Sequence, residues 1–174
     1  MLNITTFKDG ERVVLPHHGV CTFSGLIKEE ISGTTMEFAV IAVDRGIIKV
    51  PVTKLHGAVR KLSSEEEVLQ ALELLSESAD KHGRAWWQKN FTKLFRVGEI
   101  ISIATILRDS YPGPEKMDTM PHYIREFYRP ALKWMSEEAA LVLRKTPAEM
   151  VVTIEKKLGK RPKDAPRFLG AGSI

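Results

Sequence analysis

Hydrophobic and polar residues follow two different periods along the chain, and the period changes between residues 55 and 63. Before the change, short runs of β-branched and aromatic residues are separated by turn-forming segments such as Pro16-His17-His18-Gly19. This arrangement is typical of β-strands joined by short loops. The spacing favours a small, strongly bent antiparallel barrel. Its strands are expected at 12–15, 20–27, 36–43 and 47–52.

After the change, apolar residues recur every three or four positions, which is the spacing of an amphipathic helix. Two segments carry the capping-box pattern of a helix N-terminus, Ser64 with Glu67 and Thr146 with Glu149. In the second segment, Pro147 occupies the first helical position, where its missing N–H is tolerated. Helices are expected to begin after Ser64 and to lie at about 84–97, 99–110, 121–144 and 146–158.

These patterns predict an α+β protein in which an antiparallel β-barrel precedes an all-α bundle. We place the barrel at residues 1–58 and the helical domain at 59–160. Residues 161–174 form a basic, Pro-rich tail without a periodic apolar face, so we expect this tail to be loosely ordered.

The composition is that of an ordinary globular protein, with 43% hydrophobic and 28% charged residues among 174. Cys21 is the only cysteine, which excludes internal disulfides and thiolate zinc sites and fits a reducing compartment. No apolar run reaches the ~18 residues of a membrane span, and the N-terminal segment lacks the pattern of a secretory signal. We therefore expect a cytoplasmic protein without a membrane partner.

Residues that could support catalysis are sparse. His17 and His18 are adjacent, so in an extended segment they point to opposite faces and cannot hold one metal ion together. Cys21 lies in a strand pattern without a nearby histidine, and the sequence contains no phosphate-binding loop, dinucleotide fingerprint or nucleophile elbow. We expect no enzymatic activity, no metal site and no cofactor.

Basic residues dominate one helical segment, although the net charge of the whole chain is only +4. Between Lys81 and Gly98 there are five Lys or Arg residues and no acidic residue, directly after a run rich in glutamate. The modest net charge does not by itself indicate a nucleic-acid partner. The abrupt local change of sign does indicate a distinct surface.

The same segment carries an apolar stripe. If residues 84–97 form a helix, Trp87, Phe91, Leu94 and Phe95 fall on one face at i, i+4, i+7 and i+8. This spacing is typical of the buried face of a helix. We therefore expect Trp87 to be a structural residue, and we expect the same core-packing role for Trp134 on the helix at 121–144.

Trp86 lies ~100° around the helix from Trp87 and shares its side with Lys89, Asn90 and Lys93. An indole among lysines suits a wedge or stacking platform for nucleic-acid bases, with the lysines neutralising nearby phosphates. The competing interpretation is that Trp86 covers the junction between the two domains. The pattern alone leaves both interpretations open.

The last predicted strand carries an apolar edge formed by Ile47, Ile48 and Val50. An exposed strand edge has to be covered or used, and one common use is pairing with a strand of another protein. The alternative is that this strand packs onto the helical half of the chain.

Several segments, taken in order, resemble the CarD/CdnL family of bacterial transcription regulators. The segment Phe7 to Val20, FKDGERVVLPHHGV, is similar to the opening pattern of that family, F-x-x-G-[DE]-x-V-V-[YL]-P-x-x-G-V. The resemblance continues to about residue 158. The later matching segments are 47–51 (IIKVP), 57–61 (GAVRK), 103–109 (IATILRD) and 126–132 (EFYRPAL).

The resemblance implies an N-terminal Tudor-like (SH3-like) barrel that binds the β subunit of bacterial RNA polymerase. It also implies a helical domain that reaches promoter DNA at the upstream fork of the melted bubble, where a tryptophan wedges into the minor groove. Such a protein is not an enzyme, and it stabilises the open complex of polymerase. We expect a monomer in the cytoplasm, associated with the nucleoid.

The family pattern implies two sets of site residues. Lys49 corresponds to the basic residue before Val-Pro, and Glu29 stands where the family often has an arginine. The doubled tryptophan leaves Trp86 and Trp87 as candidates for the wedge, and helical phase favours Trp86. The expected DNA-binding residues are Arg84, Trp86, Trp87, Lys89 and Lys93. The expected polymerase-binding residues are Lys28, Ile48, Lys49, Val50 and Pro51.

Two other hypotheses remain open from the sequence. In one, the protein is an interaction adaptor whose barrel docks a partner strand and whose helices bind protein instead of DNA. In the other, it is a general single-stranded nucleic-acid binder, which would act without polymerase.

Overall fold

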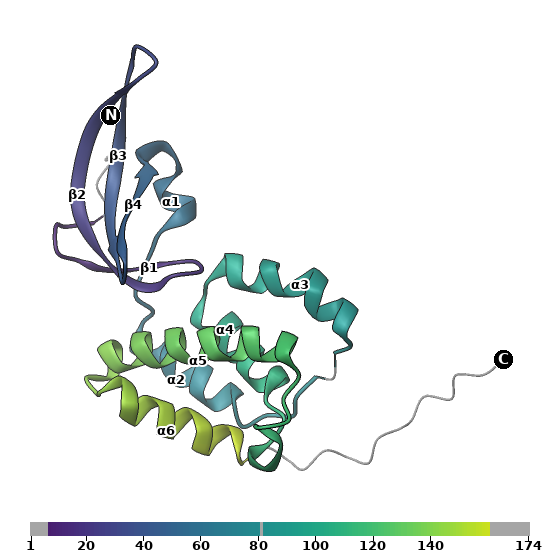
Figure 1. Cartoon of the computed structure of the whole chain (residues 1–174). Coiled ribbons are helices and arrows are strands. Elements are labelled where there is room, and N and C mark those ends of the chain that lie inside the picture. Colours follow the sequence, from purple (N-terminus) through teal and green to yellow (C-terminus); the bar gives the residue numbers. More distant parts are fainter. Residues whose placement is uncertain (1–6, 81, 161–174) are drawn as a thin grey trace.

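The computed structural model describes residues 7–80 and 82–160 (Figure 1), except for the side chains of Gln88, Phe91, Thr92 and Val97. The expected tail at 161–174 lies outside the described residues. Figure 1 shows a slender β-sheet domain, built from the N-terminal part of the chain, beside a separate group of helices.

The N-terminal domain is one antiparallel sheet with the strand order β4-β3-β2-β1-β5, so that β4 and β5 lie at its two edges. The four predicted strands are confirmed, and the second of them extends to Ile31 instead of ending at residue 27. The fifth strand was not predicted because two residues carry no recognisable alternation. The strands are β1 (Arg12–Leu15), β2 (Gly19–Ile31), β3 (Thr34–Val43), β4 (Gly46–Pro51) and β5 (Arg60–Lys61).

The sheet bends along β2. The pairing of β2 with β3 shifts its register between Phe23 and Leu26, and Gly25 lies between them with a φ of +94°. Such a bulge bends the strand and increases its twist. The residues on the inner side form a small core, which includes Phe7, Val13, Leu15, Cys21, Phe23, Ile41 and Leu55.

The C-terminal domain is helical and follows the predicted elements closely. Both capping boxes form: Glu67 N donates to Ser64 Oγ at 3.2 Å, and Glu149 N donates to Thr146 Oγ1 at 3.2 Å. None of the described helices is both long enough and apolar enough to cross a membrane. The helices are α2 (Glu65–Leu74), α3 (Arg84–Val97), α4 (Ile100–Ser110), α5 (His122–Leu143) and α6 (Pro147–Leu158), with a short 3-10 turn, η2 (Pro114–Lys116), before α5.

A short connection joins the two domains. It consists of η1 (Val52–Lys54) and α1 (Leu55–Ala58), neither of which the sequence pattern predicted. The core of the sheet gathers residues up to Val59, and the core of the helices begins at Val68. The chain is therefore the α+β protein that the sequence predicts. Through β5, the sheet extends beyond the domain boundary that we expected at residue 58.

Aromatic residues fill the contact between the two domains. The Trp134 ring on α5 lies against Gly19 of β2 so closely that a Cβ atom at residue 19 would be 2.9 Å from Trp134 Cγ. The Phe95 ring on α3 meets Trp134 edge-on at 4.7 Å between centroids and stacks with His17 at 6.2 Å. Trp134 packs on the helical core as predicted, and in addition its ring touches the sheet domain.

A buried ion pair reinforces this contact. Arg60 of β5 donates from both terminal nitrogens to the Glu138 carboxylate of α5, at 2.7 and 2.8 Å, and its Nε donates to Gly98 O at 2.9 Å. The Ser63 backbone N–H also donates to Glu138, at 2.8 Å. Because the Glu138 side chain is only 5% exposed, this network fixes the sheet domain against both α5 and the α3–α4 corner.

Candidate functional sites

The two adjacent tryptophans of α3 have different environments. Trp87 is 1% exposed, and its ring stacks with Phe127 at 6.1 Å between centroids. Phe95 is 2% exposed, and Leu94 packs partly against the same core. The predicted buried stripe is thus confirmed at Trp87, Leu94 and Phe95, whereas the side chain of Phe91 lies outside the described part of α3.

Trp86 is only partly buried, as helical phase predicts. Its ring lies parallel to the ring of His82, with 3.3 Å between centroids and 5° between planes. Its other ring neighbour is Trp87, which it meets edge-on at 5.3 Å. Both partners belong to the helical domain. The aromatic residues at the junction of the two domains include Trp134 and Phe95, so the contacts of Trp86 do not favour its interpretation as a cover for that junction.

Basic side chains are frequent along α3, and Lys89 and Lys93 share the helix side of Trp86. Arg84, Lys89, Lys93 and Arg96 are all exposed. The Arg84 guanidinium lies 5.5 Å from the centre of the Tyr123 ring, a cation–π contact that orients it. The sequence-predicted residues Arg84, Trp86, Lys89 and Lys93 are therefore exposed or partly exposed on one helix, and Trp87 alone of the predicted DNA-binding set is buried.

A polar network lies beneath His82, and the sequence analysis missed it. His82 Nε2 is 3.2 Å from Asp109 Oδ2, and Asp109 also accepts hydrogen bonds from Arg108 Nε at 2.7 Å and from Asp80 N at 3.1 Å. Burial by itself lowers the pKa of Arg108, but the hydrogen bond and charge of Asp109, together with the charges of Asp80 and Glu77, raise that pKa above its ordinary value. Asp109 and His82 are 27 residues apart, so no local pattern could have paired them.

Three members of this network also have the donor types of a metal site. Asp80, His82 and Asp109 each offer one ligand atom, and these atoms lie within 4.8 Å of one another. Arg108, however, bonds to both carboxylates, at 3.3 Å from Asp80 and 2.7 Å from Asp109. Because a cation already occupies the carboxylates, the geometry favours an ion-pair network here.

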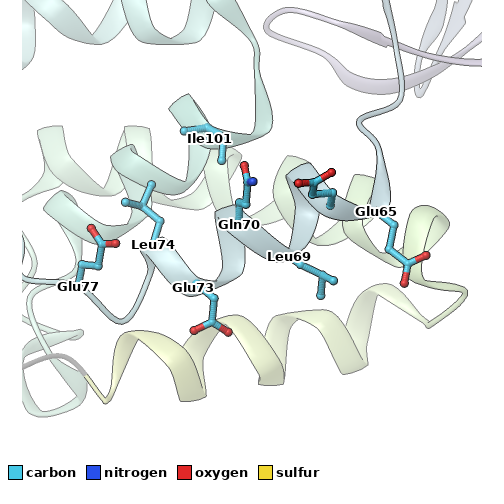
Figure 2. Close-up of a pocket in the computed structure, with 8 residues that line it drawn as sticks. Glu65, Leu69, Gln70, Glu73, Leu74, Glu77 and Ile101 are labelled. Atoms are coloured by element: carbon cyan, nitrogen blue, oxygen red, sulfur yellow. The ribbon is translucent and has the colours of Figure 1, made fainter.

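The surface of α2 is acidic, in contrast to that of α3. A groove along this helix is lined by Glu73, Leu74, Glu77 and Ile101, among others, and Figure 2 shows Glu73 on the far side of α2 from Ile101. Leu69, 49% exposed, contributes to the apolar part of the groove. The rim is acidic, although Glu73 pairs with Lys157 of α6 and Glu77 lies 3.6 Å from Arg108. The exposed cations of α3 give that helix the opposite charge.

The second predicted site lies on the edge strand β4, except for Lys28, which lies on β2. Lys49 and Lys28 are exposed, Ile48 and Pro51 are partly buried, and Val50 is 8% exposed with its side chain in the core of the sheet. Val50 can therefore contribute only backbone atoms at the surface. Ile47, which the sequence analysis placed on the apolar edge but not among the polymerase-binding residues, is 60% exposed on the same strand.

Lys49 forms an ion pair with Glu29 of β2. Both side chains remain more than one third exposed, at 39% and 38%, so the pair contributes little to stability and can be exchanged for a partner's charges. The helical domain meets the sheet mainly at β2, through α5. The Lys133–Asp44 ion pair places the β3–β4 turn near α5, whereas β4 itself pairs with β3 and lies near α1 (Figure 1), which does not favour the alternative in which the whole strand packs onto the helices.

One family model matches the chain, and it covers the sheet domain. Residues 7–63 match the CarD-like/TRCF RID domain, which is about a third of the chain and ends just after β5. The resemblance noted in the sequence is thereby confirmed for this part of the protein. The chain is an RNA polymerase-interacting, transcription-related protein, and its residues 7–63 are the RNA polymerase-interacting domain characteristic of the CarD/CdnL family.

Proposed function

We propose that this protein is a transcription regulator that binds the β subunit of RNA polymerase and stabilises the promoter open complex. The N-terminal domain, as a Tudor-like module, holds the polymerase, and Trp86 wedges into DNA at the upstream fork of the melted bubble. The observation that carries the proposal is the contrast within α3. Trp87 is buried, whereas Trp86 stays partly accessible on the helix side that carries exposed Lys89 and Lys93, with exposed Arg84 at the start of the same helix.

The chemistry of this surface suits an opened duplex. An aromatic ring stacked on a base contributes roughly 1–3 kcal/mol, and it needs a base that is not already stacked on both sides. Cations near the ring neutralise the phosphates that flank such a base. Intact duplex offers fewer sites of this kind, so the ring binds the open state better than the closed state.

Differential affinity is what shifts the promoter equilibrium. A protein that binds both the closed and the open promoter shifts the equilibrium between them only by the difference between its affinities for the two states. The net charge of +4 is modest, so binding to free DNA is expected to be weak. The polymerase-binding domain compensates for this weakness because it holds α3 close to the DNA at a high effective concentration.

The surface proposed for polymerase is the edge of β4. An edge strand offers unpaired backbone groups to a partner strand, and Lys49 adds a charge on it. Lys28 lies on β2, on the other side of β3, and would contribute its charge from there. Ile48 and Pro51 supply a partly exposed apolar surface. This arrangement supports strand pairing with the β subunit at Ile48 to Pro51, and it assigns Val50 a backbone role.

The proposal is tested with polymerase holoenzyme on promoter DNA. Trp86→Ala should shorten the open-complex lifetime by roughly 5-fold or more, since one stacking contact is lost, and should leave polymerase affinity unchanged. Lys49→Glu should abolish capture by the isolated β lobe. Val152→Ala, which truncates a 65% exposed side chain on α6, is the matched control and should change neither measurement. An unaltered lifetime with Trp86→Ala would refute the wedge.

A further inference from the structure

We propose that His82 and Asp109 form a positioning pair that orients the Trp86 ring for its contact with DNA. This inference rests on the proposed function of Trp86. It concerns residues that lie outside the basic surface of α3, on the segment before that helix and at the end of α4.

The first observation is the stack itself. The His82 and Trp86 rings are separated by 3.3 Å between centroids and are parallel within 5°. His82 also meets Trp87 edge-on, at 5.6 Å. Trp86 is thus covered on one face by His82 and contacted at one edge by Trp87, so a base can stack only on its opposite face.

The second observation is that His82 is itself fixed. Its Nε2 is bonded to Asp109, whose side chain is 1% exposed. The other oxygen of that carboxylate accepts from Arg108 Nε and from the Asp80 backbone N–H. Asp109 therefore cannot turn away from His82 without breaking bonds to two other groups. The orientation of the imidazole is set by α4, and through the stack it determines the orientation of the indole.

A ring held in place binds more tightly than a ring free to rotate. A side chain that loses its rotamer freedom on binding costs about 0.5–1.5 kcal/mol, and this cost is avoided when the protein has already ordered it. His82 supplies that order and also selects the face of Trp86 that a base can use. Loss of His82 should therefore reduce the open-complex lifetime by about 2- to 10-fold.

The stack is tested directly in the free protein by ¹⁹F NMR after incorporation of 5-fluorotryptophan. The three tryptophans give three resonances, and Trp86→Phe identifies that of Trp86. His82→Ala should shift and broaden the Trp86 resonance, and the Trp134 resonance is an internal control. His82→Phe retains a ring without the bond to Asp109, whereas His82→Gln retains a donor without a ring. Of these two variants, only His82→Phe should preserve most of the ring-current shift of the Trp86 resonance.

The functional test is a double-mutant cycle on the open-complex lifetime. His82→Ala should shorten the lifetime when Trp86 is present and should have no further effect in the Trp86→Ala protein, because the pair acts through the indole. Asp109→Asn should reproduce part of the His82→Ala effect. Thermal unfolding of each variant, followed by circular dichroism, checks that the fold is retained.

Each result has a separate meaning. An unmoved Trp86 resonance in His82→Ala would show that the pair does not orient the ring and would overturn the inference. Equal effects of His82→Ala with and without Trp86 would show that His82 acts by another route, and would overturn it as well. An unchanged lifetime in Trp86→Ala alone would instead refute the proposed function of the indole, while the NMR shift would still report whether the stack exists.

Discussion

The Arg60–Glu138 ion pair is predicted to determine the stability of the contact between the two domains. Replacing Arg60 by Met removes both hydrogen bonds to a carboxylate that is 5% exposed. It also leaves Gly98 O without its guanidinium donor. The charge of Glu138 would then be buried with one remaining bond, from Ser63 N.

The magnitude follows from burial. Breaking a fully buried ion pair by removing one partner costs about 3–5 kcal/mol. Arg60 is 24% exposed, and Glu138 keeps the bond from Ser63, so we expect a loss of about 2–3 kcal/mol. For a chain of this size, that corresponds to a fall in the melting temperature of roughly 4–12 °C. Urea unfolding followed by circular dichroism measures the free energy, and thermal unfolding measures the shift.

A second substitution, Glu138→Gln, is expected to change the free energy of unfolding in opposite directions in the native and Arg60→Met proteins. Glu138→Gln should destabilise the native protein, because it removes a charge that Arg60 compensates. The same change should stabilise the Arg60→Met protein, because there the charge has no partner. Lys133→Met provides a matched control, since Lys133 also bridges the domains, to Asp44, but with side chains 48% and 70% exposed. That control should lose less than about 1 kcal/mol. An Arg60→Met loss no larger than the control, or a Glu138→Gln effect of the same sign in both proteins, would refute this reasoning.

Two further predictions concern the fold. In urea unfolding, Gly19→Ala should lower the free energy of unfolding by about 1–3 kcal/mol more than Gly33→Ala. The two glycines have similar positive φ values, +77° and +76°, so the backbone strain is matched. Only at residue 19 would the new Cβ meet the Trp134 ring. The Glu149 carboxylate accepts hydrogen bonds from the Thr146 backbone N–H and from the Thr146 hydroxyl, and these bonds hold the pKa of Glu149 below its ordinary value. The stability that this carboxylate contributes is therefore fully present above the unfolded-state pKa. It is lost as the pH falls through the folded-state pKa. The difference in melting temperature between the native protein and Glu149→Gln should therefore shrink as the pH is lowered from 7 to 3.

The parts of the structure that could be predicted from the sequence are those set by neighbours in the chain. Both capping boxes join residues three positions apart, so the sequence contains the whole interaction. The burial of Trp87 and the exposure of Trp86 follow from the angle between consecutive residues on a helix. Helical phase therefore predicted correctly that Trp86 is the more accessible of the two tryptophans, and its contact with DNA stays a prediction.

The parts that could not be predicted depend on packing between distant segments. His82 and Asp109 are 27 residues apart, and Arg60 and Glu138 are 78 apart, and each residue alone is unremarkable in the sequence. Strand β5 has two residues and exists only because β1 lies beside it. Side chains alternate between the two faces of a strand, so Val50 and Lys49 of β4 must point to opposite faces. The burial of Val50 could therefore have been predicted from the sequence. The family pattern instead gave both residues as polymerase-binding.

These distant contacts connect the polymerase-binding sheet to Trp86 through fixed groups. Arg60 anchors the sheet to α5 and to the corner between α3 and α4, and Asp109 at the end of α4 holds His82 against the indole. A regulator that must act on two partners at once loses affinity if its two binding surfaces move independently, because the effective concentration of one surface near its target falls. Fixed contacts avoid this loss, since the position of the ring relative to the sheet is set before binding. The proposed function therefore requires the buried Arg60–Glu138 pair as much as it requires Trp86, and Arg60→Met should weaken open-complex stabilisation even though Arg60 touches neither surface.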